Sequence, residues 1–291
     1  MARVVLNNSQ LRIEISHFGA ELQSIRSVSD GTEWLWNGNG DWWSGRAPLL
    51  FPVVGISPKG AVSINGGHYP MGSHGFARHS RFDLKSANDK AAEFSLTASS
   101  QTKSSYPFDF LLQMRYELDG KDLVCSAKVT NSNKTPMPMQ FGFHPAFNWP
   151  LPGCEGLEHQ IRFPAGLPPA LRRPEASGLI DEAPRALPVG QHDKAIEIVA
   201  GHYAEGAMVF QNLNHDEIIY SAGEKAVHMY LENLPDFALW QKEGAPFICL
   251  EPWQGTAPYP SQGDDLRART NSIELAPGES RVFTMTLRFN G

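Results

Sequence analysis

Hydrophobic and polar residues alternate along much of this chain. The alternating apolar positions are Leu11, Ile13 and Ile15; Phe94 and Leu96; Leu112, Met114, Tyr116 and Leu118; Leu123, Cys125, Ala127 and Val129; Ile196 and Ile198; and Phe283, Met285, Leu287 and Phe289. A period of two residues is typical of a strand that buries one face and exposes the other. Because these segments run from one end of the chain to the other, the pattern predicts strands throughout.

Helices are expected to be few. No stretch of a dozen residues carries an apolar stripe with the 3.6-residue period of a helix, and the one short helical candidate lies around Asp264 to Thr270. The sequence Asn65-Gly66-Gly67 tolerates positive φ and therefore predicts a hairpin between Ser63-Ile64 and His68-Tyr69. Many strands separated by turn residues indicate an all-β sandwich or barrel rather than alternating strands and helices.

The length leaves the number of domains open. A chain of 291 residues can hold two domains of about 150 residues, although one large sandwich can reach about 250. The proline-rich segment 150–188 is either a linker between two domains or a long surface excursion within one. Because the strand pattern has the same character on both sides of it, we predict a single domain over residues 1–291.

Composition and charge exclude several classes of protein. The chain is 41% hydrophobic and 19% charged, which is typical of a globular protein and not of a disordered one. Its net charge of −6 provides no cationic field for nucleic acid or for an anionic membrane. The first residues lack the pattern of a secretory signal, and no apolar run approaches the roughly 18 residues of a membrane span. We therefore expect a cytoplasmic protein without a nucleic-acid or membrane partner.

Cysteines and short motifs give no support for a metal or a nucleotide cofactor. The three cysteines are far apart and odd in number, so they indicate neither a disulfide framework nor a zinc site. His68, His74 and His79 match no standard zinc spacing, and His68 and His79 are expected at the surface. Dinucleotide, P-loop, zinc-protease and serine-hydrolase signatures are all missing from the sequence.

The densest candidate chemistry lies in the segment Phe247–Gly255. Its four apolar residues Phe247–Leu250 predict a buried strand that ends at Glu251, at the rim of a sheet. Pro252 favours extended geometry at Glu251, and an apolar setting would raise the pKa of that carboxyl and keep it competent as a proton acceptor near neutrality. Trp253 offers a flat face for the C–H groups of a sugar. The structural alternative is a charged strand end paired with an arginine.

Two histidines and one arginine are further candidates. His144 lies among aromatic residues, where a neutral imidazole can donate or accept a proton, although a hydrogen-bonded core histidine gives the same pattern. His74 is flanked by small residues that let a ligand come close. Arg46 directly precedes an apolar segment, and its donors suit several hydroxyl or carboxylate oxygens. An arginine that closes a loop by bonding backbone carbonyls explains Arg46 equally well.

Four segments in a fixed order carry a resemblance to a known family. They are Gly45–Pro52, His74–Arg78, Phe143–Pro145 and Leu250–Trp253. Together they resemble the galactose mutarotase (aldose 1-epimerase) superfamily, most closely its bacterial branch of aldose-epimerase-like proteins, from the N-terminal strands to Phe289. The resemblance implies a large antiparallel β-supersandwich, in agreement with the strand pattern.

The resemblance also implies roles for individual residues. Glu251 matches the catalytic carboxylate of the family, His144 its catalytic acid, and His74 and Arg46 its substrate-binding residues. Family members commonly carry an Asp that binds sugar hydroxyls where this chain has Gly206, with Glu205 beside it. This departure bears on the identity of the sugar more than on the reaction.

The implied activity is that of a mutarotase, which interconverts the α and β anomers of a monosaccharide without a cofactor or a metal. Glu251 would take the proton of the anomeric hydroxyl and His144 would protonate the ring oxygen, while Arg46 and Trp253 hold the pyranose. The acting form is expected to be a monomer or a homodimer.

Three alternatives remain at this stage. A glycosidase needs two carboxylates about 5 to 10 Å apart, and no second carboxylate lies in a comparable motif. A non-catalytic carbohydrate-binding protein needs hydroxyl partners but no matched acid and base. A hexose-phosphate mutarotase needs a phosphate clamp, for which Arg78, Arg81 and Lys59 are candidates.

Overall fold

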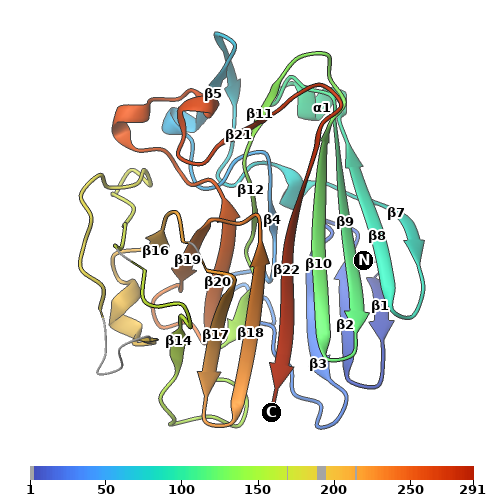
Figure 1. Cartoon of the computed structure of the whole chain (residues 1–291), viewed down its shortest axis with the longest axis vertical. Coiled ribbons are helices and arrows are strands. Elements are labelled where there is room, and N and C mark those ends of the chain that lie inside the picture. The colour runs from blue at the N-terminus through green and yellow to red at the C-terminus, as the bar shows by residue number, and fades with distance from the viewer. Residues whose placement is uncertain (1–2, 169, 189–194, 214) are drawn as a thin grey trace.

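A large antiparallel sheet runs the length of the molecule in the computed structural model, which describes residues 3–168, 170–188, 195–213 and 215–291 (Figure 1). From one edge to the other its strands are β15 (Ala195–Glu197), β14 (Gln160–Arg162), β17 (Glu217–Ala222), β18 (Lys225–Glu232), β22 (Ser280–Asn290), β10 (Asp122–Asn131), β9 (Phe110–Asp119), β8 (Ala91–Thr97) and β7 (Asp83–Ala87). All the alternating apolar positions predicted from the sequence are buried, so the period-two prediction is confirmed.

A second antiparallel sheet packs against the first. Its strands are β16 (Met208–Phe210), β19 (Asp236–Trp240), β20 (Phe247–Gln254), β12 (Phe141–Phe143) and β4 (Leu49–Leu50), with β13 (Ala146–Asn148) also paired to β20. The ring of Phe141 in β12 stacks on that of Phe283 in β22, with 5.0 Å between the centroids. The hydroxyl of Tyr220 in β17 donates to the carbonyl of Asn148 in β13 at 2.9 Å. Apolar burial between the two sheets is the main source of stability for such a sandwich.

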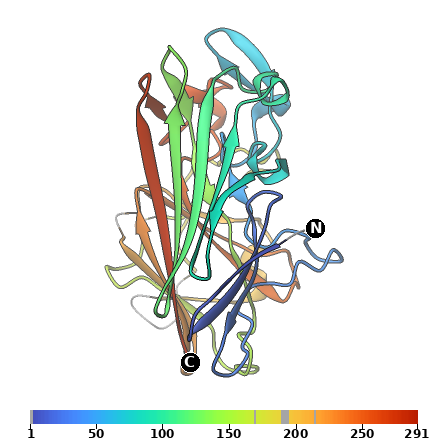
Figure 2. The same cartoon turned by 90° about the vertical axis from the view of Figure 1, so that its right-hand side faces the viewer.

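The N-terminal strands form a third, smaller sheet that contacts β8 and β9 through its first strand (Figure 2). Its strands are β1 (Arg3–Asn7), β2 (Leu11–Ser16) and β3 (Leu22–Ser27). The remaining elements are the strand pairs β5 (Ala61–Ile64) with β6 (Gly67–Pro70) and β11 (Met137–Met139) with β21 (Ile273–Leu275), the helix α1 (Ser100–Lys103), and the 3₁₀ turns η1 (Pro58–Gly60), η2 (Ala77–His79), η3 (Ala200–Tyr203), η4 (Pro260–Gln262) and η5 (Leu266–Ala268).

The all-β class is confirmed, and so is the hairpin. Asn65 and Gly66 connect β5 to β6 with φ of 52° and 78°, the pair of positive values that a tight two-residue hairpin turn requires. The helix expected around Asp264 to Thr270 is only the single 3₁₀ turn η5, and the short helix α1 lies elsewhere. Within the described ranges, no helix has the length and apolar character needed to cross a membrane.

The proline-rich segment 150–188 contributes to both sheets. Its strand β14 pairs with β15 and β17 in the large sheet. Further along, Arg172 forms an isolated antiparallel bridge with Val209 of β16, which brings this segment to the edge of the second sheet. One hydrophobic cluster includes residues from Leu6 to Phe289, and the single domain over residues 1–291 stays a prediction.

Candidate active site

Strand β20 presents its two faces to different surroundings. Ile248 and Leu250 point into the main core, whereas Cys249, Glu251 and Trp253 lie on the opposite face, because side chains alternate along a strand. Glu251 is 2% exposed and lies between two smaller apolar clusters, one of which contains Cys249 and the other Trp253. The sheet therefore holds a carboxyl group in an apolar setting, as the sequence predicts.

The position of Glu251 at a strand end is a prediction that the structure corrects. Strand β20 continues through Pro252 to Gln254, so Glu251 lies within the strand and not at the rim. The backbone N–H of Leu250 donates to the carbonyl of Pro145 at 3.1 Å, and Pro252 faces the same side two residues later. That side is the gap between β12 and β13, so the missing N–H of proline costs the sheet no ladder hydrogen bond.

His144 lies in the same gap. Strands β12 and β13 both pair with β20, and the short connection between them carries His144 to the side of Glu251. The distance from His144 Nε2 to Glu251 Oε2 is 3.1 Å, and His144 is 5% exposed. Two positions separated by about a hundred residues in the sequence thus form one buried acid and base pair.

His74 approaches the pair from a loop between β6 and η2. The backbone N–H of Gly55 donates to His74 Nδ1 at 3.1 Å, and the backbone N–H of His74 donates to the carbonyl of Gly55 at 2.8 Å. Because Nδ1 accepts, the proton of the neutral ring is on Nε2. Burial lowers the pKa of His74 to about 3, so this histidine stays neutral and acts as a fixed hydrogen-bond donor.

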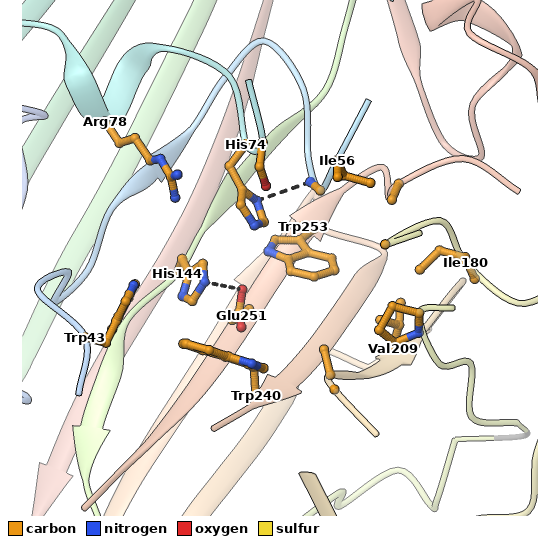
Figure 3. Close-up of a pocket in the computed structure, with 17 residues that line it drawn as sticks. Trp43, Ile56, His74, Arg78, His144, Ile180, Val209, Trp240, Glu251 and Trp253 are labelled. Atoms are coloured by element: carbon orange, nitrogen blue, oxygen red, sulfur yellow. Dashed lines mark hydrogen bonds and ion pairs between the residues drawn. The ribbon is translucent and has the colours of Figure 1, made fainter. Parts of the chain in front are cut away.

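These side chains line one cavity of about 390 Å³ (Figure 3). Its volume lies within the usual range of small-molecule sites. The indole Nε1 of Trp253 is buried and has no partner among the described residues, so it is available to a ligand. The lining residues are Trp43, Gly55, Ile56, Ser73, His74, Arg78, His144, Pro174, Gly178, Ile180, Gly206, Ala207, Val209, Trp240, Glu251, Trp253 and Ala257.

Burial shifts the titration of the pair in opposite directions. It raises the pKa of Glu251 well above the usual 4.5. Burial, followed by the nearby His74 and Arg78, lowers the pKa of His144 well below the usual 6.5. Both shifts oppose charge in an apolar site, so burial favours the pair as carboxylic acid and neutral imidazole over the pair as separate charges.

Arg46 does not line this cavity. Its guanidinium donates to the backbone carbonyl of Gln23, and its backbone N–H donates to Glu21 Oε1 at 2.8 Å. This is the loop-closing arrangement that the sequence left open as an alternative. Arg78 lines the cavity instead, with its guanidinium directed toward the region of His74 (Figure 3). The Nε of Arg78 donates to His79 at 3.1 Å, while neither terminal nitrogen donates to a described residue.

Two tryptophans that sequence reasoning missed enclose His144. The ring of Trp43 stacks on the imidazole with 5.0 Å between centroids, and Trp240 meets it edge-on at 5.9 Å. Trp43 precedes the Gly45–Pro52 segment, but nothing in its local sequence separates it from a core tryptophan. Trp240 ends β19, beside Cys249 of β20. Together the two rings exclude water from the pair and fix the plane of the imidazole.

The backbone conformation at Gly206 disfavours the aspartate that family members commonly carry at this position. Gly206 has a φ of +86°, and a Cβ there would lie 2.8 Å from the ring of Pro174. An aspartate at this position would therefore be strained. Glu205 does not replace it, because its side chain is 67% exposed and forms an ion pair with Arg185. Neither residue provides a carboxylate to the cavity.

One group of side chains has the composition of a metal site. His144, Cys249 and Glu251 place potential ligand atoms within 4.8 Å of one another, and these three residue types all occur as ligands of Zn²⁺ in proteins. Burial raises the pKa of the Cys249 thiol well above 9, so a metal would have to displace protons from both the thiol and the carboxyl. The donor set thus fits a metal poorly, and the absence of a metal stays a prediction.

Comparison with known proteins supports the resemblance seen in the sequence. The family model described as aldose 1-epimerase matches residues 2–288. The plasmid LacX protein of Lactococcus lactis subsp. lactis is 28% identical over 289 residues, which cover 94% of this chain and 95% of LacX.

Two solved structures share the architecture. A galactose mutarotase related enzyme from Lactobacillus acidophilus superposes with a TM-score of 0.92 at 24% identity, over 100% of this chain and 98% of that one. A galactose mutarotase-like protein from Lactobacillus casei has a TM-score of 0.90 at 24% identity, over 99% and 100% of the two chains. At such identities the structures show the fold alone, and they confirm the predicted galactose mutarotase-like sandwich.

Proposed function

The chain belongs to the aldose 1-epimerase family, and from this premise we propose that it is a mutarotase, which interconverts the α and β anomers of a free aldose by acid-base ring opening and closure. The observation that carries the proposal is the contact of 3.1 Å between His144 and Glu251 beside a cavity of about 390 Å³. A pure binding site has no need for a buried acid and base in contact, because burying ionisable groups costs stability.

The reaction requires one proton acceptor and one proton donor. Transfer of the proton from Glu251 to His144 across their contact gives the reactive form of the pair. Glu251 as carboxylate then takes the proton of the anomeric hydroxyl, and protonated His144 gives one to the ring oxygen. The C1–O5 bond breaks as the C1=O1 bond forms, which leaves the open aldehyde. The pair is then carboxylic acid and neutral imidazole. Rotation about C1–C2 and reversal of both transfers closes the ring on its other face. The net charge of the pair is the same throughout, so no charge has to enter or leave the apolar site.

Other side chains of the cavity orient the sugar. His74 Nε2–H and Trp253 Nε1–H are fixed donors for ring or hydroxyl oxygens. Arg78 takes the binding role that the sequence gave to Arg46, because its terminal nitrogens are available at the cavity. The face of Trp253 packs against sugar C–H groups. Holding the pyranose in one orientation contributes to rate by proximity.

The test is polarimetry of freshly dissolved α-D-glucose, α-D-galactose and further aldoses with the purified protein. We expect faster relaxation to the same final optical rotation, because a catalyst changes the rate and not the equilibrium. Binding of the same sugars is followed by tryptophan fluorescence, since Trp43, Trp240 and Trp253 line the cavity. Sugar binding without acceleration for any free or phosphorylated aldose would contradict the enzyme proposal and support a carbohydrate-binding protein.

A phosphorylated substrate has less support from the geometry. Of the three candidate phosphate ligands, Arg78 lines the cavity, whereas Arg81 lines a separate groove and Lys59 another. A single arginine leaves a dianionic phosphate only partly neutralised in an otherwise apolar site. We therefore assign free aldoses as the substrate class.

The pH profile provides a second prediction. The pKa of His144 is lowered, so His144 takes up a proton in the uncharged pair only at a pH below its usual 6.5. The pKa of Glu251 is raised, so Glu251 loses its proton only at a pH well above its usual 4.5. We expect kcat/KM to stay level as pH falls from 7.5 through 6.5, and to decline only at lower pH. His68→Gln, which changes an exposed histidine paired with Asp264, should leave this profile unchanged. An acid limb centred at or above pH 6.5 would contradict the assignment.

A further inference from the structure

The cavity has two chemically different ends. Figure 3 shows His74, His144 and Arg78 on one side of Trp253, and Ile56, Ile180 and Val209 on the other. We use the name apolar wall for the lining side chains of Ile56, Pro174, Ile180, Ala207, Val209 and Ala257. Most of them pack in one hydrophobic cluster that also includes Trp253, and Pro174 joins it through a bridge to Ile180. The wall is therefore continuous with the tryptophan that faces the catalytic end.

Polar groups near the apolar wall are engaged with one another. Gln211 donates to the hydroxyl of Thr256 at 2.9 Å and accepts a hydrogen bond from the hydroxyl of Tyr259. None of these three side chains lines the cavity as the structure describes it. The wall thus gains no hydrogen-bonding group from the layer behind it.

The charged groups of the same region are also turned away from a ligand. Arg173 donates to the backbone carbonyls of Gly206 and His202 at 2.7 and 2.6 Å. Glu205 forms its ion pair with Arg185. Gly206 lines the cavity without a side chain, and its left-handed backbone beside Pro174 leaves no space for one.

A sugar hydroxyl against the side chains of this wall would lose its water partners and gain no side-chain hydrogen bond in return. Such a loss costs more than the burial of a C–H group, which gains from the contact. In the proposed reaction, C1, O1 and the ring oxygen lie at Glu251 and His144. The far edge of a pyranose then carries C3 and C4, with C6 attached at C5, and this edge meets the apolar wall.

We propose that the substrate is a deoxy aldose, which carries hydrogen in place of a hydroxyl at C3, C4 or C6. This proposal rests on the proposed function. The 2-hydroxyl is not included, because it lies next to the anomeric carbon at the polar end. A methyl group at C5 or a methylene in the ring would pack against the apolar side chains of Ile180 and Val209 without losing a hydrogen bond. The polar donors His74 and Arg78 remain for the oxygens near C1.

The test compares D-glucose with its 2-, 3-, 4- and 6-deoxy derivatives, and D-galactose with its 6-deoxy derivative. For each sugar, kcat/KM of the wild-type protein is divided by the uncatalysed rate constant of that sugar. We expect at least one derivative modified at C3, C4 or C6 to exceed its parent by about 10- to 10²-fold, the range in which an apolar pocket discriminates against an added hydroxyl. The 2-deoxy sugar should show no such gain.

A variant of the wall gives the matching evidence. Val209→Thr adds a hydroxyl in nearly the same volume and should reduce the preference for the deoxy sugar, whereas Val282→Thr, on the exposed part of β22, should leave it unchanged. Dissociation constants of the same sugars separate the two proposals. If the parent sugars turn over faster than every deoxy derivative, the deoxy assignment is overturned and the mutarotase proposal stands. If a deoxy sugar binds more tightly than its parent but no sugar turns over, the mutarotase proposal is overturned and the preference of the apolar wall for deoxy sugars is supported. No binding of any sugar overturns both.

Discussion

Replacing Glu251 by glutamine should lower kcat/KM for mutarotation by about 10² to 10⁴, the usual contribution of a positioned acid or base. Glutamine has the same shape and can still contact His144, but it cannot accept the proton of the anomeric hydroxyl. His144→Asn should lower kcat/KM by a similar factor, because asparagine cannot give a proton to the ring oxygen. Because the two groups act as a unit, the double variant should be little slower than either single variant.

The protein contains a second Glu–His pair that serves as a control. His228 Nδ1 lies 2.8 Å from Glu217 Oε1 on the solvent side of β17 and β18. Glu217→Gln and His228→Asn repeat the same chemical changes far from the cavity and should leave kcat/KM at the wild-type value. Glu251→Gln should also melt no lower than the wild type, because burial disfavours the carboxylate that it removes. A fully active Glu251→Gln protein would remove Glu251 from the mechanism.

The strands were predictable because their signal is local. Alternation at Leu112 to Leu118 or at Phe283 to Phe289 depends only on which face of a strand is buried, and it needs no knowledge of the partner strand. The hairpin at Asn65-Gly66 is local in the same way. The pairing order of the strands, by contrast, depends on contacts between distant segments, so no local pattern predicts it, and the family resemblance implied only the sandwich as a whole.

The site was predictable only where backbone position decides the role. Glu251, His144 and His74 reach the cavity because β20, the gap between β12 and β13, and the loop before η2 carry them there. The role of Arg46 depends instead on the direction of its long side chain, which turns away to the backbone carbonyl of Gln23 in β3. No local sequence pattern predicts the direction of such a side chain. The same is true of Trp240, which alternates like any core residue, and of Pro174, which closes the space beside Gly206 from the proline-rich segment.

Gly75→Ala should produce the largest loss of stability among the substitutions considered. Gly75 has a φ of +71°, and a Cβ there would lie 2.2 Å from the carbonyl oxygen of Phe51. That oxygen already accepts hydrogen bonds from the backbone N–H groups of Phe76 and Ala77, so it cannot move without breaking them. Left-handed strain and overpacking together cost about 2 to 5 kcal/mol of unfolding free energy.

The same substitution should also impair catalysis. Gly75 directly follows His74, whose ring position depends on two hydrogen bonds with Gly55. A shift of about 1 Å in such a group can cost 10²-fold in rate, so we expect a lower kcat/KM even where the variant remains folded. Gly72→Ala is the matched control, because a Cβ at Gly72 meets no atom within 4 Å and its φ is not left-handed. Denaturant unfolding and polarimetry of both variants make the comparison, and equal stability of the two would contradict the role of the contact between Gly75 and Phe51.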